Sequence, residues 1–313
     1  MLTILYNRMK KVFITTLSIA ALSSVCMLTS CGGGTKSDTD NMGSDSTKVD
    51  TTAAKQSNES SSEMSYQIPS PKEMFVFIKQ VASKNNKRVD VLNSPDNAKN
   101  YTDAKTQALN FGIYSCDLTY CSIFQIGPEM IKYFKTVKQL GDAIGVSNSI
   151  NPTVAKNLEK NMDNPDSLVE IADNLYFSSF ETMQNSQQGN ILALSVAGGY
   201  IEGLSIACKL VKYDKKNPAV ERIADEKYTL DNIIDFMKKY ESDAGVKETI
   251  AKLEELRTTF NQVVEKQEGK VALKEEKGTK VLGGGSELEM TETQYKAIAD
   301  KVTSIRNSFT GNK

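Results

Sequence analysis

Most prolines in this chain stand where a helix is expected to begin. Five of the seven follow Ser, Asn or Gly directly ahead of a segment whose apolar residues recur at helical spacing. Proline suits the first turn of a helix, where its missing N–H would have no partner anyway. No series of alternating segments indicates strands. We therefore expect an all-α fold, with helix starts at Pro71, Pro128, Pro152, Pro165 and Pro218.

The spacing of the apolar residues also gives the approximate extent of each helix. Residues 190–211 are nearly all apolar or small, as is typical of a helix buried on most sides. Residues 270–282 alternate loosely and fit either a small hairpin or a loop, and Gly283–Gly285 predicts a flexible joint. No second linker interrupts residues 70–266, so we expect one bundle-like domain. The predicted helices cover about 71–82, 97–125, 128–144, 152–162, 164–185, 190–211, 217–240, 244–266 and 291–308.

The N-terminal region resembles a bacterial lipoprotein signal. Lys10 and Lys11 precede a short apolar stretch, which ends in Leu-Thr-Ser and then Cys31. The resemblance implies that residues 1–30 are removed and that Cys31 is acylated. Residues 31–68 are rich in Ser, Thr, Asp and Gly and should form a disordered tether. The helical domain then covers residues 69–313. We expect it in the cell envelope, at the outer rather than the inner membrane, and both the periplasmic and the surface face stay open.

Composition excludes several classes of activity. The chain contains no histidine, which removes Ser-His-Asp and Cys-His catalysis and His-ligated zinc. The formal charge is −1, and no basic cluster points to nucleic acid. No phosphate loop, dinucleotide motif or calcium loop occurs, so we expect neither a cofactor nor a metal. Cys208 could pair with Cys116 or Cys121, or all three could be buried apolar side chains.

Two polar features stand out in the apolar helical segments. Asn110, Tyr114 and Asp117 share one face of a predicted helix, beside an apolar face. Glu202 is the only acid between residues 190 and 211, and glycines flank it. A glycine in a helix costs about 1 kcal/mol relative to alanine, so we expect a packing or binding reason for these glycines.

The residues around these features resemble an uncharacterised Bacteroidetes lipoprotein family. Its pattern Asn-x-Gly-x-Tyr-x-x-Asp-Leu-x-Tyr is met at residues 110–120, and its pattern Gly-Gly-x-x-Glu-Gly-Leu at residues 198–204. The resemblance covers about residues 70–310. It implies lipidation and a helical fold, and it supplies no mechanism.

Several functions stay open on this reasoning. We expect a lipid-anchored protein that binds a small ligand or an envelope protein without turning it over. A hydrolase using Asp117 and Glu202 is the alternative from another class, and a scaffold in an envelope complex is the third. The two acids could instead form a core network with tyrosines, because a buried carboxylate must be hydrogen-bonded or paired. The candidate ligand-binding residues are Asn110, Tyr114, Asp117, Tyr120, Tyr200 and Glu202.

Overall fold

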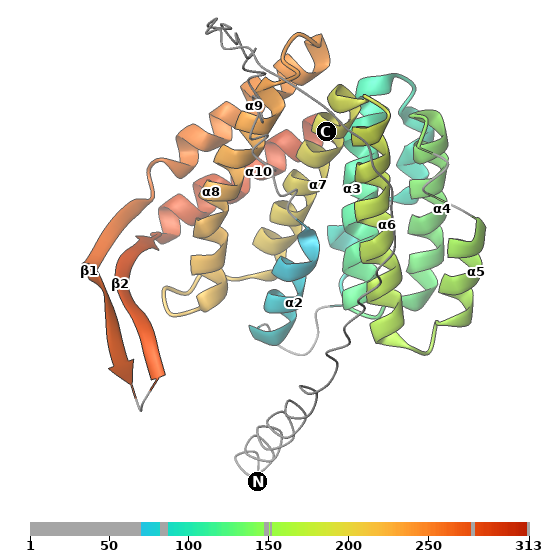
Figure 1. Cartoon of the computed structure of the whole chain (residues 1–313). Coiled ribbons are helices and arrows are strands. Elements are labelled where there is room, and N and C mark those ends of the chain that lie inside the picture. The colour runs from blue at the N-terminus through green and yellow to red at the C-terminus, as the bar shows by residue number, and fades with distance from the viewer. Residues whose placement is uncertain (1–69, 82–86, 147–149, 151, 277–278, 312–313) are drawn as a thin grey trace, which may run out of the picture. The chain divides into compact units, whose positions relative to one another are not determined.

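The computed structural model describes residues 70–81, 87–146, 150, 152–276 and 279–311. The predictions for the signal peptide, Cys31 and the tether lie outside these residues. The described fold is all-α apart from one hairpin, as predicted (Figure 1). Its elements are α2 (Pro71–Val81), η1 (Val89–Val91), η2 (Pro95–Asn100), α3 (Ala104–Ile123), α4 (Gly127–Ala143), α5 (Pro152–Lys160), α6 (Pro165–Asn185), α7 (Gly189–Leu210), α8 (Pro218–Lys238), α9 (Ala244–Phe260), β1 (Val264–Glu276), β2 (Thr279–Glu289) and α10 (Glu292–Thr310).

Helices α3 and α7 pack against each other at the centre of this domain. Figure 1 shows α4, α5 and α6 on the side of α3, and α8, α9 and α10 on the side of α7. Helix α2 contacts α3, α7 and α8. Every residue of α7 from 192 to 207 is buried, which confirms the expectation drawn from its apolar composition.

Glycines allow the backbones of α3 and α7 to approach closely. A Cβ atom added at Gly112 would lie 1.9 Å from the carbonyl oxygen of Ser195, and one added at Gly198 would lie 1.9 Å from that of Leu109. No other residue fits such a contact. The Ser195 hydroxyl donates to the Ala108 carbonyl oxygen at 3.1 Å across the same interface. Gly198, four residues before Glu202, thus serves helix packing.

Side-chain caps explain where the helices begin. Asn164 accepts a hydrogen bond from the Ser167 N–H, and Asn217 accepts one from the Ala219 N–H, each directly before a proline. Ser70 accepts from the Lys72 N–H at 3.2 Å. Such caps satisfy backbone donors that have no partner within the helix. The prediction of helix starts at these Ser-Pro and Asn-Pro steps is confirmed.

The helix predicted over residues 97–125 is wrong in one respect, because it is two elements. η2 ends at Asn100, and α3 begins at Ala104. Asp103 is the reason, since its side chain accepts from the Thr106 N–H at 3.0 Å and starts a new helix.

The segment left open as hairpin or loop is a hairpin, and it is longer than residues 270–282. Strands β1 and β2 pair antiparallel from Val264 opposite Glu289 to Glu276 opposite Thr279. The triple glycine lies within β2 and is not a joint. Gly285 pairs with Glu268 and Gly283 with Ala272, opposite a register irregularity. The extra residues of this irregularity lie on β1, where residues 268–272 face residues 283–285, so the glycines are on the strand opposite the bulge.

Among the described residues, α7 is the one helix long and apolar enough to cross a membrane. Within the domain, 89% of that stretch is buried. Core helices share this length and composition, so α7 gives only weak support for a membrane span.

Candidate functional site

A buried ion pair joins the last helix to the centre of the fold. The Arg306 guanidinium on α10 donates from Nε to Glu202 Oε2 at 2.5 Å and from Nη2 to Oε1 at 2.7 Å. The Glu202 side chain has no exposed surface, and that of Arg306 is 7% exposed. This two-point geometry satisfies both carboxylate oxygens, as a buried charge requires.

Asp117 lies beside this pair. Its Oδ2 accepts from the Asn93 N–H at 3.2 Å. Burial and the negative charge of Glu202 raise the pKa of Asp117 well above its usual range, although Arg306 opposes this shift. The shift favours the neutral, protonated form of Asp117. Its Oδ1 has no hydrogen-bond partner within the described part of the chain.

Amide and hydroxyl groups extend this network to the end of α10. Asn110 Nδ2 donates to the Phe309 carbonyl oxygen at 2.9 Å. The Tyr101 hydroxyl accepts from Asn93 Nδ2 at 3.1 Å and donates to the Thr310 carbonyl oxygen at 3.3 Å. The polar stripe of α3 thus fastens the last turn of α10 and the segment before η2.

The predicted tyrosines have other partners. The Tyr114 hydroxyl donates to the Ser94 carbonyl oxygen at 2.6 Å, and the Tyr120 hydroxyl accepts from the Arg88 N–H at 3.1 Å. Neither tyrosine hydrogen-bonds to Asp117 or Glu202 through these contacts. Asn110, Tyr114, Asp117, Tyr120 and Glu202 are all buried. They form core contacts, and no cavity described below is lined by any of them.

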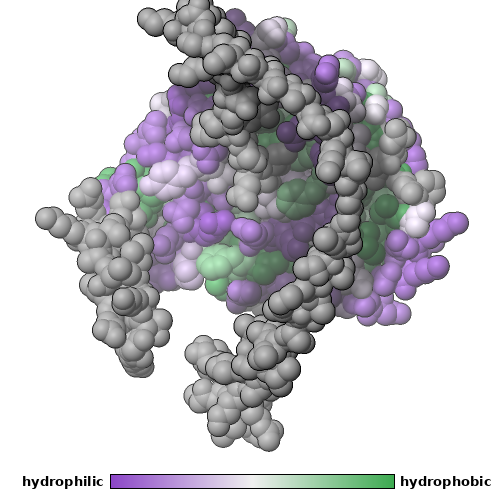
Figure 2. Space-filling view, viewed as in Figure 1, coloured by the Kyte–Doolittle hydropathy of each residue, from purple (hydrophilic) through white to green (hydrophobic). Residues whose placement is uncertain are grey.

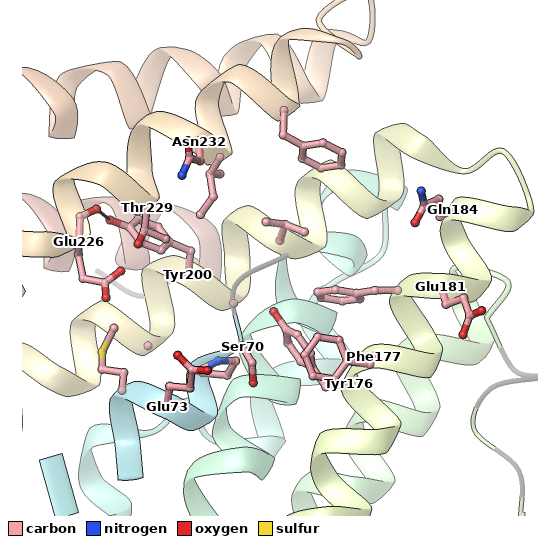
Figure 3. A pocket seen from close by; sticks show the side chains of 18 of the residues that line it. Ser70, Glu73, Tyr176, Phe177, Glu181, Gln184, Tyr200, Glu226, Thr229 and Asn232 are labelled. Atoms are coloured by element: carbon pink, nitrogen blue, oxygen red, sulfur yellow. Dashed lines mark hydrogen bonds between the residues drawn. The ribbon is translucent and has the colours of Figure 1, made fainter. Parts of the chain in front are cut away.

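A cavity of about 660 Å³ opens between α2, α6, α7 and α8 (Figure 3). Tyr200 is the one predicted site residue that lines it. Figure 3 shows Tyr176 and Phe177 projecting from α6 on one side, and Glu226, Thr229 and Asn232 coming from α8 on the other. Its aromatic lining consists of Tyr176, Phe177, Phe180, Tyr200 and Phe236.

Glu226 is the buried charge of this cavity. The residue is 4% exposed. Burial raises the pKa of its carboxyl group to about 7, and Arg222 and a hydrogen bond with Thr229 only partly oppose this. Among the described residues, no Lys or Arg nitrogen lies within ion-pair distance of the Glu226 carboxylate. The backbone carbonyl oxygen of Glu226 accepts from the Tyr200 hydroxyl at 2.9 Å, which fixes α8 against α7 at this point.

The start of α2 closes one edge of the cavity and is held to α6. Ser70 Oγ donates to Asp173 Oδ1 at 3.3 Å, and Lys72 Nζ lies 2.7 Å from Asp173 Oδ2. Ser70 and Glu73 face the cavity from this side. The cavity therefore has walls that are fixed by hydrogen bonds on both α2 and α8.

Glu226 was not selected in the sequence analysis, although the spacing of residues in α8 contains a pattern that could have identified it. Ile223, Leu230 and Ile233 are buried on one face of α8, and Glu226 occupies the same stripe, three residues after Ile223. An acid in an apolar stripe is the pattern that singled out Glu202. The rest of the cavity had no local signal, because four helices far apart in the sequence form it.

The described cysteines do not form a reactive or metal-binding group. Cys116, Cys121 and Cys208 are free thiols. Burial raises the pKa of all three, that of Cys208 to about 12, which disfavours the nucleophilic thiolate. Within the described residues, no cluster of His, Cys, Asp and Glu could hold a metal ion.

No protein-family model, curated protein or solved structure matches this chain.

Proposed function

We propose that this chain is a lipid-anchored envelope protein whose helical domain binds a small organic ligand in the cavity between α2, α6, α7 and α8. The observation that carries the proposal is Glu226, a buried acid in an aromatic cavity of about 660 Å³. Ligand sites are usually largely preformed apolar cavities of about 300–1,000 Å³ with a few polar groups that fix orientation. The anchor part of the proposal rests on the sequence around Cys31.

The surface supports the same location. Figure 2 shows hydrophobic residues gathering near the middle of one face, within a mostly hydrophilic surround. Phe177, on the rim of the cavity, is one of the most exposed large apolar residues, at 44%. An exposed ring at the mouth of an aromatic cavity offers an apolar ligand a first contact.

We favour binding without turnover over the alternative of a hydrolase that uses Asp117 and Glu202. Both acids have no exposed surface, and Arg306 satisfies both oxygens of Glu202. A substrate could not reach them in this conformation. We propose a structural role for these acids and place ligand binding at the cavity.

The test uses the neutral fluorescent probe N-phenyl-1-naphthylamine and two neighbouring tryptophan substitutions in α8. Thr229 lines the cavity, whereas Tyr228 is 46% exposed and lies outside it. Wild type should bind the probe saturably at one site. Thr229→Trp should fill the cavity and weaken binding by about tenfold or more, and Tyr228→Trp should leave it unchanged.

Excitation of the probe at its own absorption band avoids signal from tryptophan, and circular dichroism checks that both variants fold. The absence of saturable binding to wild type would reject the proposal. So would equal affinity of wild type and Thr229→Trp.

A further inference from the structure

We propose that the ligand of this cavity is an organic cation with an apolar body, which places its positive charge beside Glu226 and its apolar part against the rings of α6. This inference rests on the proposed function and specifies the chemical class of the ligand. It follows from the charge of the lining, the separation of rings and carboxylates, and the state of Glu226.

The charges of the lining favour a cation. Glu73 from α2, Glu181 from α6 and Glu226 from α8 line the cavity, and Arg222 is the one basic residue among the described lining. Three carboxylates against one guanidinium leave a net charge of −2 when all are ionised. A cationic ligand would reduce this repulsion, and an anionic one would increase it.

The arrangement of the lining separates two kinds of contact. Figure 3 shows Tyr176 and Phe177 on α6 across the cavity from Glu226 on α8, with Ser70, just before α2, and Glu73 of α2 along one edge. Aromatic faces attract both apolar groups and cations. A molecule spanning the cavity would therefore have an apolar part on α6 and a charged part toward α8.

A bound cation would stabilise the ionised carboxylate of Glu226. Its ionised form is disfavoured by burial, and the described residues offer it a hydrogen bond from Thr229 but no ion pair. A buried carboxylate without a cation is costly. A cation entering the cavity would supply the missing partner, so its binding and the ionisation of Glu226 should stabilise each other.

This coupling predicts how affinity changes with pH. The carboxyl of Glu226 has a pKa of about 7, so its ionised fraction rises between pH 6 and pH 8. The other charged groups that face the cavity are Glu73, Glu181 and Arg222. Tyr176 and Tyr200 stay neutral, because burial raises their pKa values well above the usual range. Affinity for a permanent cation should therefore rise over this interval.

The experiment compares three probes that share a naphthalene ring and differ in charge. They are (1-naphthylmethyl)trimethylammonium, 1-naphthylmethanol and 1-naphthylacetate, titrated calorimetrically into the full-length protein at pH 6, 7 and 8. At pH 8 the cation should bind about tenfold or more tightly than the other two probes. Its affinity should fall from pH 8 to pH 6, and that of the alcohol should not.

Two matched variants locate the effect. Glu226→Gln should remove the preference for the cation and its pH dependence, while affinity for the alcohol stays within about twofold of wild type. Glu181→Gln removes the same charge from an exposed position on the rim, and it should weaken cation binding by less than about threefold.

The outcomes separate this inference from the proposed function. If the alcohol binds but the cation binds no more tightly, or if Glu226→Gln keeps the preference, the ligand class is wrong and the binding cavity stands. If none of the three probes binds while N-phenyl-1-naphthylamine binds saturably, the ligand class is wrong and the binding cavity stands. If N-phenyl-1-naphthylamine also fails to bind, both proposals are rejected.

Discussion

Replacing Gly198 by alanine should damage this fold much more than the same change at Gly203. Both glycines lie in α7, in the stretch that is buried throughout. A Cβ at Gly198 would lie 1.9 Å from the Leu109 carbonyl oxygen of α3, a backbone atom that cannot turn aside. A Cβ at Gly203 would meet only Cys116 Sγ at 3.6 Å and the Pro71 Cβ at 3.8 Å, which are ordinary contacts.

The two substitutions should change the free energy of unfolding in opposite directions. Each alanine gains up to about 1 kcal/mol of helix stability over glycine. At Gly198, real Cβ contacts stay beyond 3.0 Å, so α3 and α7 would have to move apart by more than 1 Å in a packed core. Overpacking of this kind costs about 1–3 kcal/mol and occasionally more. We expect a net loss of up to about 2 kcal/mol for Gly198→Ala and a gain of up to about 1 kcal/mol for Gly203→Ala.

Urea unfolding of the full-length chain, followed by circular dichroism, measures both free energies of unfolding. For a domain of this size, about 2 kcal/mol corresponds to a fall in Tm of about 4–8 °C. Gly112→Ala should behave like Gly198→Ala, because its Cβ would lie equally close to the Ser195 carbonyl oxygen. If Gly198→Ala and Gly203→Ala have equal stability, the close contact of the two helices does not exist as described.

Three further predictions concern charges and the anchor. Glu202→Ala should lower the free energy of unfolding, measured in urea, by about 3–5 kcal/mol, because it leaves Arg306 buried without a carboxylate. The double variant Glu202→Leu, Arg306→Met should recover much of this loss. A double variant that is as unstable as the sum of both single changes would contradict the pairing. Burial raises the pKa of Glu226 to about 7 in the folded state, so the folded protein binds more protons than the unfolded one between about pH 4.5 and 7. The free energy of unfolding should therefore fall as pH rises through this interval. From pH 5 to pH 8, wild type should therefore lose about 2 kcal/mol more than Glu226→Gln, and parallel curves for the two proteins would show that Glu226 is not the group responsible. Cys31→Ala should move the protein from the membrane fraction to the soluble fraction, and its persistence in membranes would speak against acylation at this residue.

Local patterns account for the parts of the fold that were predicted correctly. Apolar spacing and Asn-Pro or Ser-Pro steps involve neighbours within one or two turns, and the caps at Asn164 and Asn217 use those same neighbours. The break before α3 was missed because Asp103 also fits inside a helix, and only its hydrogen bond to Thr106 shows otherwise. The place of Gly283–Gly285 in β2 depends on the opposite strand, which a local reading of glycine does not consider.

The candidate site was harder to predict because its contacts are distant in sequence. Asp117 and Glu202 were identified as unusual acids, but Arg306, the partner that explains Glu202, lies 104 residues later. Of the ligand-site residues predicted, Tyr200 lines the cavity and the other residues lie in the core. Glu226 could have been found by the argument used for Glu202, since both acids interrupt apolar stripes.

The pairing of Glu202 with Arg306 also affects when the protein can fold during its synthesis. The ribosome makes Glu202, on α7, long before it makes Arg306, the arginine that pairs with it. A nascent chain that stops short of α10 would have to enclose Glu202 without its counter-ion, which is strongly unfavourable. The central helices should therefore stay loosely assembled until the last helix has been synthesised, and a truncation that removes Arg306 should yield a chain that proteases degrade.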